Sequence, residues 1–133
     1  MELHQFTNGI EDHKSEMAKV IDNFGLYTNH EDGYSYTVGL HNLGLPELIV
    51  FGQNPNVAEE LFEILHHCAR EGLIEFSPGI GLDNILSPGP SLHDYPNEKK
   101  VTQLYAARNF FGTWEFDVIE VRIEKMDMKV NEK

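Results

Sequence analysis

The residues best suited to chemistry lie in one short stretch, where a predicted strand ends in a tight reversal. Tyr36, Thr37 and Gly39 belong to the run Tyr-Thr-Val-Gly-Leu, and His41 and Glu47 follow shortly after it. A glycine in a strand indicates a bulge, or the close approach of another backbone or a ligand. Loops on a rigid sheet commonly carry binding sites, so these five residues form the candidate ligand-binding site.

Glu47 has two competing interpretations within this stretch. Burial at the mouth of an apolar strand raises the pKa of a carboxyl group that is not paired, which makes Glu47, with His41 nearby, a weak candidate for acid–base catalysis. The alternative is that the carboxylate accepts hydrogen bonds from loop amides and holds the turn. The structural role is the favoured prediction.

Weak candidates for metal ligands share one predicted helix face. Glu63, His67 and Glu71 follow one another at intervals of four residues, which aligns two carboxylates and an imidazole in a row. The sequence lacks the His-Glu-x-x-His and Cys-x-x-Cys patterns of zinc sites. We therefore interpret the row as an exposed helix face and predict no metal site.

No complete catalytic set is recognisable. Cys68 falls on an apolar helical stripe, which indicates a buried, inert thiol. The glycine pair Gly79-Ile-Gly81 lacks the third glycine of a dinucleotide loop and the lysine of a P-loop. The sequence therefore favours a protein that is not an enzyme, and it predicts no cofactor.

The chain is strongly acidic. Its 133 residues include 10 Lys and Arg against 22 Asp and Glu, a formal net charge of −12. This charge repels nucleic-acid phosphates, so no direct binding to nucleic acid is expected. The remaining interpretations are solubility, attraction to a basic surface of a partner protein, and mimicry of nucleic acid, which the scattered positions of the acids disfavour.

The expected location is the cytoplasm. A single cysteine cannot form an intramolecular disulfide, which suits a reducing compartment. No apolar run approaches the roughly 20 residues of a membrane-spanning helix, so no membrane association is predicted. The polar, acidic stretch Met1–Glu16 does not resemble a secretory signal.

Hydrophobic periodicity and turn signals predict the elements that position the candidate residues. In the first half they are an Asn8-Gly9 turn, a helix over Asp12–Phe24 capped by Asp12 and Gly25, strands over Gly25–His30, Tyr34–Leu40 and Leu48–Phe51, and a helix over Asn54–Gly72 capped by Asn54 or Asn56. In the second half they are a strand over Leu73–Phe76, a helix over Asn97–Phe111 and a strand over Thr113–Ile123. Glu31-Asp32-Gly33 indicates a hairpin turn. The continuous apolar run Leu48–Phe51 indicates a central strand with both faces covered.

These elements favour a single α+β domain over residues 1–133. Their order, α-β-β-β-α-β-α-β, predicts a mainly antiparallel sheet with about three helices packed against it. Residues 1–10 and 125–133 are expected to be flexible ends. The last strand could form an unprotected edge, which would favour a homodimer.

Two strings of the sequence resemble a known family. Tyr36-Thr37-Val38-Gly39-Leu40 followed by Leu45-Pro46-Glu47-Leu48-Ile49-Val50-Phe51-Gly52 is similar to the signature of the bacterial and phage domain-of-unknown-function 4262 family. Three further stretches are similar in kind to segments of this family: the predicted helix Val57–Arg70, the segment Phe76–Gly79, and Leu104–Ala107 with Phe111-Gly112. The resemblance covers about residues 20–120 and implies a fold and a candidate site rather than a reaction.

The chain also departs from that family pattern. Family members often follow the last strand with Trp-Pro-Asp and a terminal Pro-Trp, and Val121–Lys133 contains neither. His41 stands where the family commonly has a small hydroxyl residue. Any site that the missing segment lines in other members is therefore altered or absent in this chain.

Two classes of function follow. The first is a protein-interaction module, regulatory or inhibitory, that acts through an acidic surface. The second is a small-molecule domain, binding a nucleotide-like ligand or hydrolysing it, with a pocket near Tyr36, His41 and Glu47.

Overall fold

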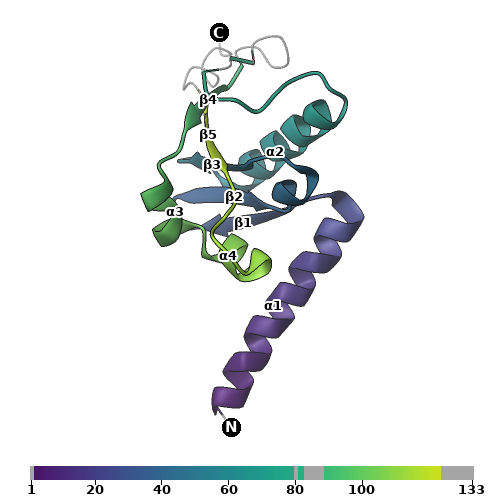
Figure 1. Cartoon of the computed structure of the whole chain (residues 1–133), viewed down its shortest axis with the longest axis vertical. Helices are drawn as coiled ribbons and strands as arrows, with labels where there is room; N and C mark the ends of the chain where they lie inside the picture. The colour runs from purple at the N-terminus through teal and green to yellow at the C-terminus, as the bar shows by residue number, and fades with distance from the viewer. Residues whose placement is uncertain (1, 80, 83–88, 124–133) are drawn as a thin grey trace.

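A five-stranded sheet forms the centre of the fold (Figure 1). The computed structural model describes residues 2–79, 81–82 and 89–123, with the backbone alone for residues 2–12. The elements are α1 (Glu2–Phe24), β1 (Tyr27–Glu31), β2 (Tyr34–Val38), the 3-10 helix η1 (Leu40–Leu43), β3 (Glu47–Phe51), α2 (Pro55–Arg70), β4 (Ser91–Asp94), α3 (Asn97–Gln103), α4 (Tyr105–Phe111) and β5 (Val118–Arg122). The predicted α+β class and order are confirmed, with two helices where one long helix was expected.

The strands lie in the order β1-β2-β3-β5-β4. All neighbours pair antiparallel except β3 and β5, which are parallel. The predicted central place of β3 is confirmed. The expectation that the last strand is an edge is wrong, because β5 pairs with β3 on one side and β4 on the other. The last strand therefore gives no reason to expect a homodimer.

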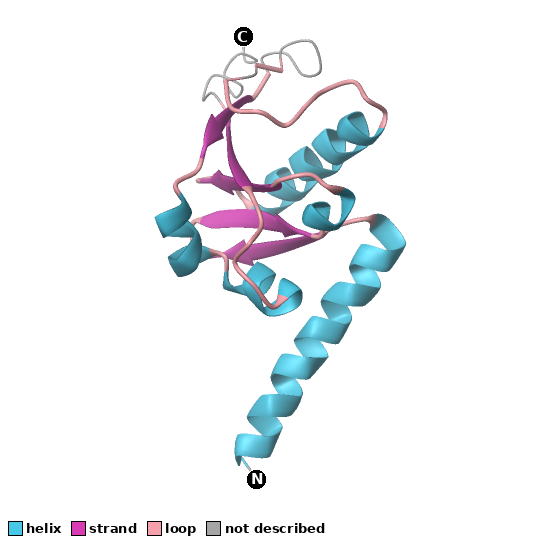
Figure 2. Ribbon diagram, viewed as in Figure 1, coloured by secondary structure: helices cyan, strands magenta, loops and turns pink. Residues whose placement is uncertain are grey.

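Helices cover both faces of the sheet (Figure 2). Successive side chains of a strand point to opposite faces, so Leu48 enters one apolar cluster and Ile49 the other. The first cluster is completed by α2 and the second by α1 and α4. The side chains of β5 alternate in the same way, since Val118 and Ile119 enter different clusters.

The first helix is longer than predicted. It begins at Glu2, so the expected turn at Asn8-Gly9 and the cap at Asp12 are wrong. A glycine inside a helix costs only about 1 kcal/mol relative to alanine, which a helix of 23 residues tolerates. Figure 1 shows the first half of α1 extending beyond the sheet. The expected flexible stretch 1–10 thus overlaps a helix, whereas 125–133 lies outside the described residues.

Local signals in the first half are confirmed where turn chemistry is explicit. Gly25 ends α1 with a φ of 93° and donates its N–H to the carbonyl of Ile21 at 2.8 Å. Asp32 and Gly33 connect β1 to β2. The side chain of Asn54 accepts the N–H of Val57 at 3.0 Å and caps α2. Each of these residues supplies a backbone conformation or an acceptor that the turn requires.

The second half corrects three predictions. Residues 73–76 are not a strand; the fourth strand is β4, which pairs with β5. The long helix predicted over Asn97–Phe111 breaks at Leu104, which has φ −108° and ψ 53°. The break leaves Val101 and Tyr105 exposed rather than on a common buried face. The strand predicted over Thr113–Ile123 is shorter in the structure, where it covers only β5.

Candidate functional site

Glu47 is enclosed by donors from the preceding turn. Its side chain is fully buried. One carboxylate oxygen accepts the Thr37 hydroxyl at 2.7 Å and the Leu40 N–H at 3.3 Å. The other accepts the N–H groups of Gly39 at 3.0 Å and His41 at 2.9 Å. The carboxylate thus satisfies three backbone donors at the start of η1, as the structural interpretation predicts.

Thr37 connects this carboxylate to the sheet. Its hydroxyl oxygen accepts the N–H of Leu48 at 2.9 Å while its hydrogen is donated to Glu47. The β2–β3 register accordingly ends at the pair of Tyr36 and Ile49, because Leu48 bonds a side chain. We call the set Thr37, Gly39, Leu40, His41 and Glu47 the carboxylate lock.

Gly39 allows the lock to form. Its φ is 124°, a conformation that L side chains rarely adopt. A Cβ at this position would lie 3.1 Å from Ile21 and 3.2 Å from the carbonyl oxygen of Gly25. The close backbone approach that a strand glycine indicates is therefore made by the end of α1.

Two effects compete for the pKa of Glu47. Burial raises this pKa, the hydrogen bonds from Thr37 and from the amides of His41, Gly39 and Leu40 lower it, and the net result is a pKa of about 7, above the ordinary value of 4.5. Burial is the larger effect because the group has lost all contact with water. The carboxyl group therefore titrates near neutral pH.

Tyr36 lies apart from the lock. It is fully buried, and its hydroxyl accepts the N–H of Ala106 at 2.9 Å, which joins β2 to α4. Burial raises the pKa of this hydroxyl above its usual range. Four predicted site residues thus come together in the lock, whereas Tyr36 fastens a helix. Their assignment as ligand-binding residues stays a prediction.

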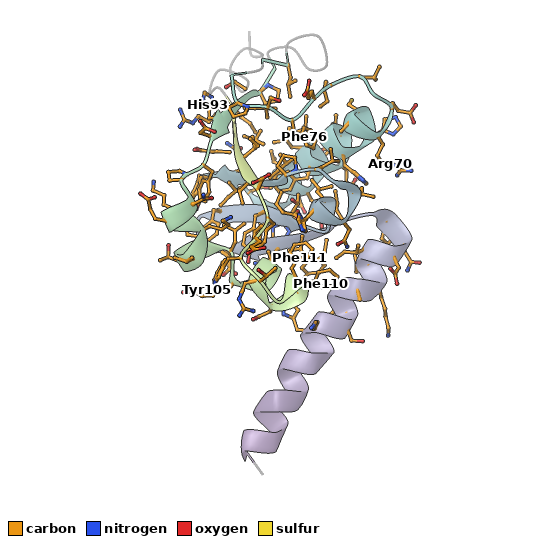
Figure 3. All side chains as sticks on the ribbon, in the orientation of Figure 1. Arg70, Phe76, His93, Tyr105, Phe110 and Phe111 are labelled. Atoms are coloured by element: carbon orange, nitrogen blue, oxygen red, sulfur yellow. The ribbon has the colours of Figure 1, made fainter. Side chains whose placement is uncertain are left out.

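His41 is the member of the lock that reaches the surface. Its backbone is held by Glu47, and its exposed ring packs edge-on against Phe111, with centroids 5.1 Å apart. Figure 3 shows Phe110 and Phe111 together on α4. His41 lines a hollow of about 430 Å³ whose other lining residues are Asn97, Lys100, Trp114, Glu115, Phe116 and Asp117.

A second hollow of about 430 Å³ shares Asn97 and Asp117 with the first. Its remaining lining residues are Pro46, Phe76, Pro78, Asp94, Tyr95, Val118 and Ile119. We call the two adjoining hollows the acidic groove, because they bring together the carboxylates of Asp94, Glu115 and Asp117. The groove runs past the start of β5, where the N–H of Glu47 donates to the carbonyl of Asp117 at 2.8 Å.

The one lysine of the groove is engaged within the fold. Lys100 is buried, and its ammonium group donates to the carbonyls of Trp114 at 3.0 Å and Phe116 at 2.5 Å. It also lies 4.9 Å from the centre of the Phe116 ring. The exposed carboxylates therefore outnumber the available positive charge, and the groove suits a ligand that donates hydrogen bonds or carries positive charge.

The three weak metal-ligand candidates lie at the surface. Glu63 and His67 are exposed on α2, and Glu71 is exposed at the position that caps its C-terminal end. In the described ranges, no group of three or more His, Cys, Asp and Glu side chains is arranged to hold a metal ion. Cys68 is buried on the inner side of α2, as predicted.

Sequence reasoning missed most of the acidic groove. Asp94, Lys100 and Trp114 come from separate segments, and only the pairing of β4 with β5 and the folding of α3 bring them close. The available signal was the close succession of two aromatic and two acidic residues in Trp114-Glu115-Phe116-Asp117, a segment that forms no strand and places all four residues around one hollow.

A comparison with protein families agrees with the family resemblance of the sequence. A family model described as a domain of unknown function (DUF4262) matches residues 9–125. Searches of curated proteins and of solved structures gave no match. Within the described residues, no helix combines the length and apolar character needed to cross a bilayer. Because the match spans most of the sequence, the chain belongs to the DUF4262 family.

Proposed function

We propose that this chain is a protein-interaction module that receives a basic segment of a partner protein in the acidic groove. The observation that carries the proposal is the gathering of Asp94, Glu115 and Asp117 around two adjoining hollows with aromatic walls. The formal charge of −12 adds a long-range attraction for a basic partner. Regulation or inhibition of the partner is the form of activity that such binding would take.

The hydrogen bonds of Glu47 are all made within the chain, which favours a binding function over a catalytic one. All four donors around this carboxylate belong to the chain itself, and the side chain is fully buried. An acid–base group must come within hydrogen-bond reach of the proton that it transfers. His41 is exposed, and its ring packs against Phe111 and Phe116.

The single tryptophan provides a direct test. Trp114 lines the groove, so its fluorescence should change when an arginine-rich peptide is titrated into the full chain. Saturable binding that weakens with added salt is expected, because the attraction is between exposed charges. An unchanged spectrum, or an equal response to a glutamate-rich peptide of the same length, would overturn the proposal.

Paired variants locate the binding surface. The double variant E115Q/D117N should raise the Kd for the peptide about tenfold, a loss of about 1.4 kcal/mol. The control E60Q/E98Q removes the same charge at exposed positions outside the groove. Equal weakening by both doubles would assign the attraction to net charge alone.

A small neutral or cationic molecule is the second candidate ligand. Each hollow measures about 430 Å³, within the roughly 300–1,000 Å³ of typical ligand pockets. The carboxylates disfavour the phosphates of a nucleotide. A thermal-shift screen of nucleosides, nucleotides and flavins tests this candidate, since a ligand at one hundred times its Kd stabilises by about 2.7 kcal/mol. Stabilisation by a nucleoside without the peptide response would select it.

A further inference from the structure

A second concave site lies away from the acidic groove, where α1 ends and β1 begins beside α2. This hollow of about 270 Å³ is lined by Val20, Phe24, Leu26, Tyr27, Thr28, Glu59 and Glu63. We call it the cation hollow. None of its lining residues is a lysine or arginine, and it shares no residue with the acidic groove.

The charge of the hollow comes from one face of α2. Glu59 and Glu63 are four residues apart, which places them on adjacent turns of the same face. His30 lies 4.0 Å from Glu59, and both side chains are partly exposed. Glu63 takes part in no ion pair within the described ranges. The two carboxylates therefore keep most of their capacity to accept hydrogen bonds.

An exposed aromatic ring borders these carboxylates. Phe24, the last residue of α1, is 71% exposed. A cation over an aromatic face is attracted by the negative charge density of the ring. An aromatic ring beside two carboxylates is the arrangement that recognises an organic cation, because the ring attracts the charge and the carboxylates accept its N–H groups.

An independent observation comes from Thr28. This lining residue is only 9% exposed, and its hydroxyl has no hydrogen-bond partner in the described part of the chain. A buried polar group without a hydrogen-bond partner destabilises the fold. This oxygen is itself covered, so a rotation of the Thr28 side chain toward the hollow lets it accept an N–H from a group seated there.

We propose that the cation hollow binds a guanidinium group. A planar guanidinium offers five N–H donors and stacks on aromatic rings, which matches two carboxylates, a threonine hydroxyl and Phe24. The volume of about 270 Å³ falls below the size of drug-sized ligand pockets, so it suits a single side chain or a small molecule. The guanidinium can belong to an arginine of a protein or to a free arginine-like molecule.

NMR titration of the ¹⁵N-labelled full chain tests this proposal. Free arginine should shift the amide signals of Tyr27, Thr28 and Glu63 in a saturable way. Citrulline, which has nearly the same shape but a neutral urea group, should shift them far less. Equal shifts with both ligands, or no saturable shift with arginine, would overturn the proposal. A capped Gly-Arg-Gly peptide distinguishes the sources: tighter binding than free arginine assigns a protein side chain, and weaker binding a small molecule.

Variants test whether arginine binds in the cation hollow, rather than in the acidic groove or through the net charge of the chain. E59Q/E63Q should raise the Kd for arginine more than about tenfold, whereas E60Q/E71Q, with the same charge change on exposed residues outside the hollow, should change it less than about twofold. F24L keeps an apolar side chain and should weaken binding about two- to fivefold. Equal losses in the two doubles would refute the site. The change in Trp114 fluorescence on adding the arginine-rich peptide should persist in E59Q/E63Q, because the cation hollow shares no residue with the acidic groove.

Discussion

The carboxylate lock and the acidic groove use the same chemical group in opposite ways. In the lock, one carboxylate accepts four hydrogen bonds from its own chain and is fully buried. In the groove, Asp94, Glu115 and Asp117 are exposed. A carboxylate satisfied by its own fold determines conformation, whereas an exposed one remains available to a partner. Of these four carboxylates, only Glu47 lies in the stretch that resembles the family signature, and in this chain its hydrogen bonds hold the turn before β3.

The largest expected effect is the loss of stability when the carboxylate lock is removed. Glu47→Ala leaves three buried N–H groups and one hydroxyl without an acceptor, each worth about 1–3 kcal/mol. We expect a loss of at least about 4 kcal/mol in the free energy of unfolding, measured by urea denaturation. Glu115→Ala, at an exposed groove position, should change stability by less than about 0.5 kcal/mol. Similar losses in both variants would contradict the contrast.

The pH dependence of stability is the next largest effect. The folded pKa of Glu47, about 7, lies above its ordinary value of 4.5. The folded state therefore holds a proton more tightly, and the contribution of this group is fully present below about pH 4.5 and declines as the pH rises through 7. A difference of 2.5 pKa units, 7 minus 4.5, corresponds to about 3 kcal/mol.

Carbon-13 NMR can measure this titration directly. The side-chain carboxyl of Glu47 should titrate with a midpoint near pH 7, and comparison of unfolding at pH 5 and pH 8 should show the accompanying loss of stability. The Thr37→Val variant, which lacks the hydroxyl donor, should raise the midpoint further. A midpoint below 4.5 would show that the four donors outweigh burial.

The smallest of the three effects isolates Thr37. Thr37→Val keeps the shape of the side chain but removes one donor to Glu47 and the acceptor of the Leu48 N–H. We expect a loss of about 2 kcal/mol in thermal or urea unfolding. Thr37→Ser keeps the hydroxyl and should lose less than about 1 kcal/mol. Equal losses would mean that packing of the methyl group, rather than the hydrogen bonds, stabilises the lock.

The sequence predicts local structure well where one residue type has a single physical use. Asp32-Gly33, Asn54 and Gly25 mark a turn, a cap and a helix end that the structure confirms. It fails where competing signals are close in energy. Asn8-Gly9 resembles a turn but lies within a long helix, since one helical glycine costs little.

The candidate site, too, was predictable only where a single residue stands out in its local sequence. Glu47 and Gly39 stand out because a carboxyl group at a buried strand and a strand glycine both need a reason. The acidic groove did not stand out, because Asp94 and Asp117 meet only through tertiary contacts. Exposed carboxylates are also common in a chain with 22 acidic residues, so no local pattern distinguishes those of the groove.

The parallel pairing of β3 and β5 governs the order in which the chain can complete its sheet. The partner of β3 lies some seventy residues later in the sequence: Glu47 faces Val118 and Val50 faces Val121. Until β5 is made, one side of a strand whose residues Glu47–Val50 are all buried in the finished fold has no neighbour. Contacts between distant segments form slowly, and an uncovered apolar edge pairs readily with other chains. A chain emerging from the ribosome is therefore most prone to aggregation between the synthesis of these two strands, and slower synthesis or a holding chaperone would affect its yield most during that interval.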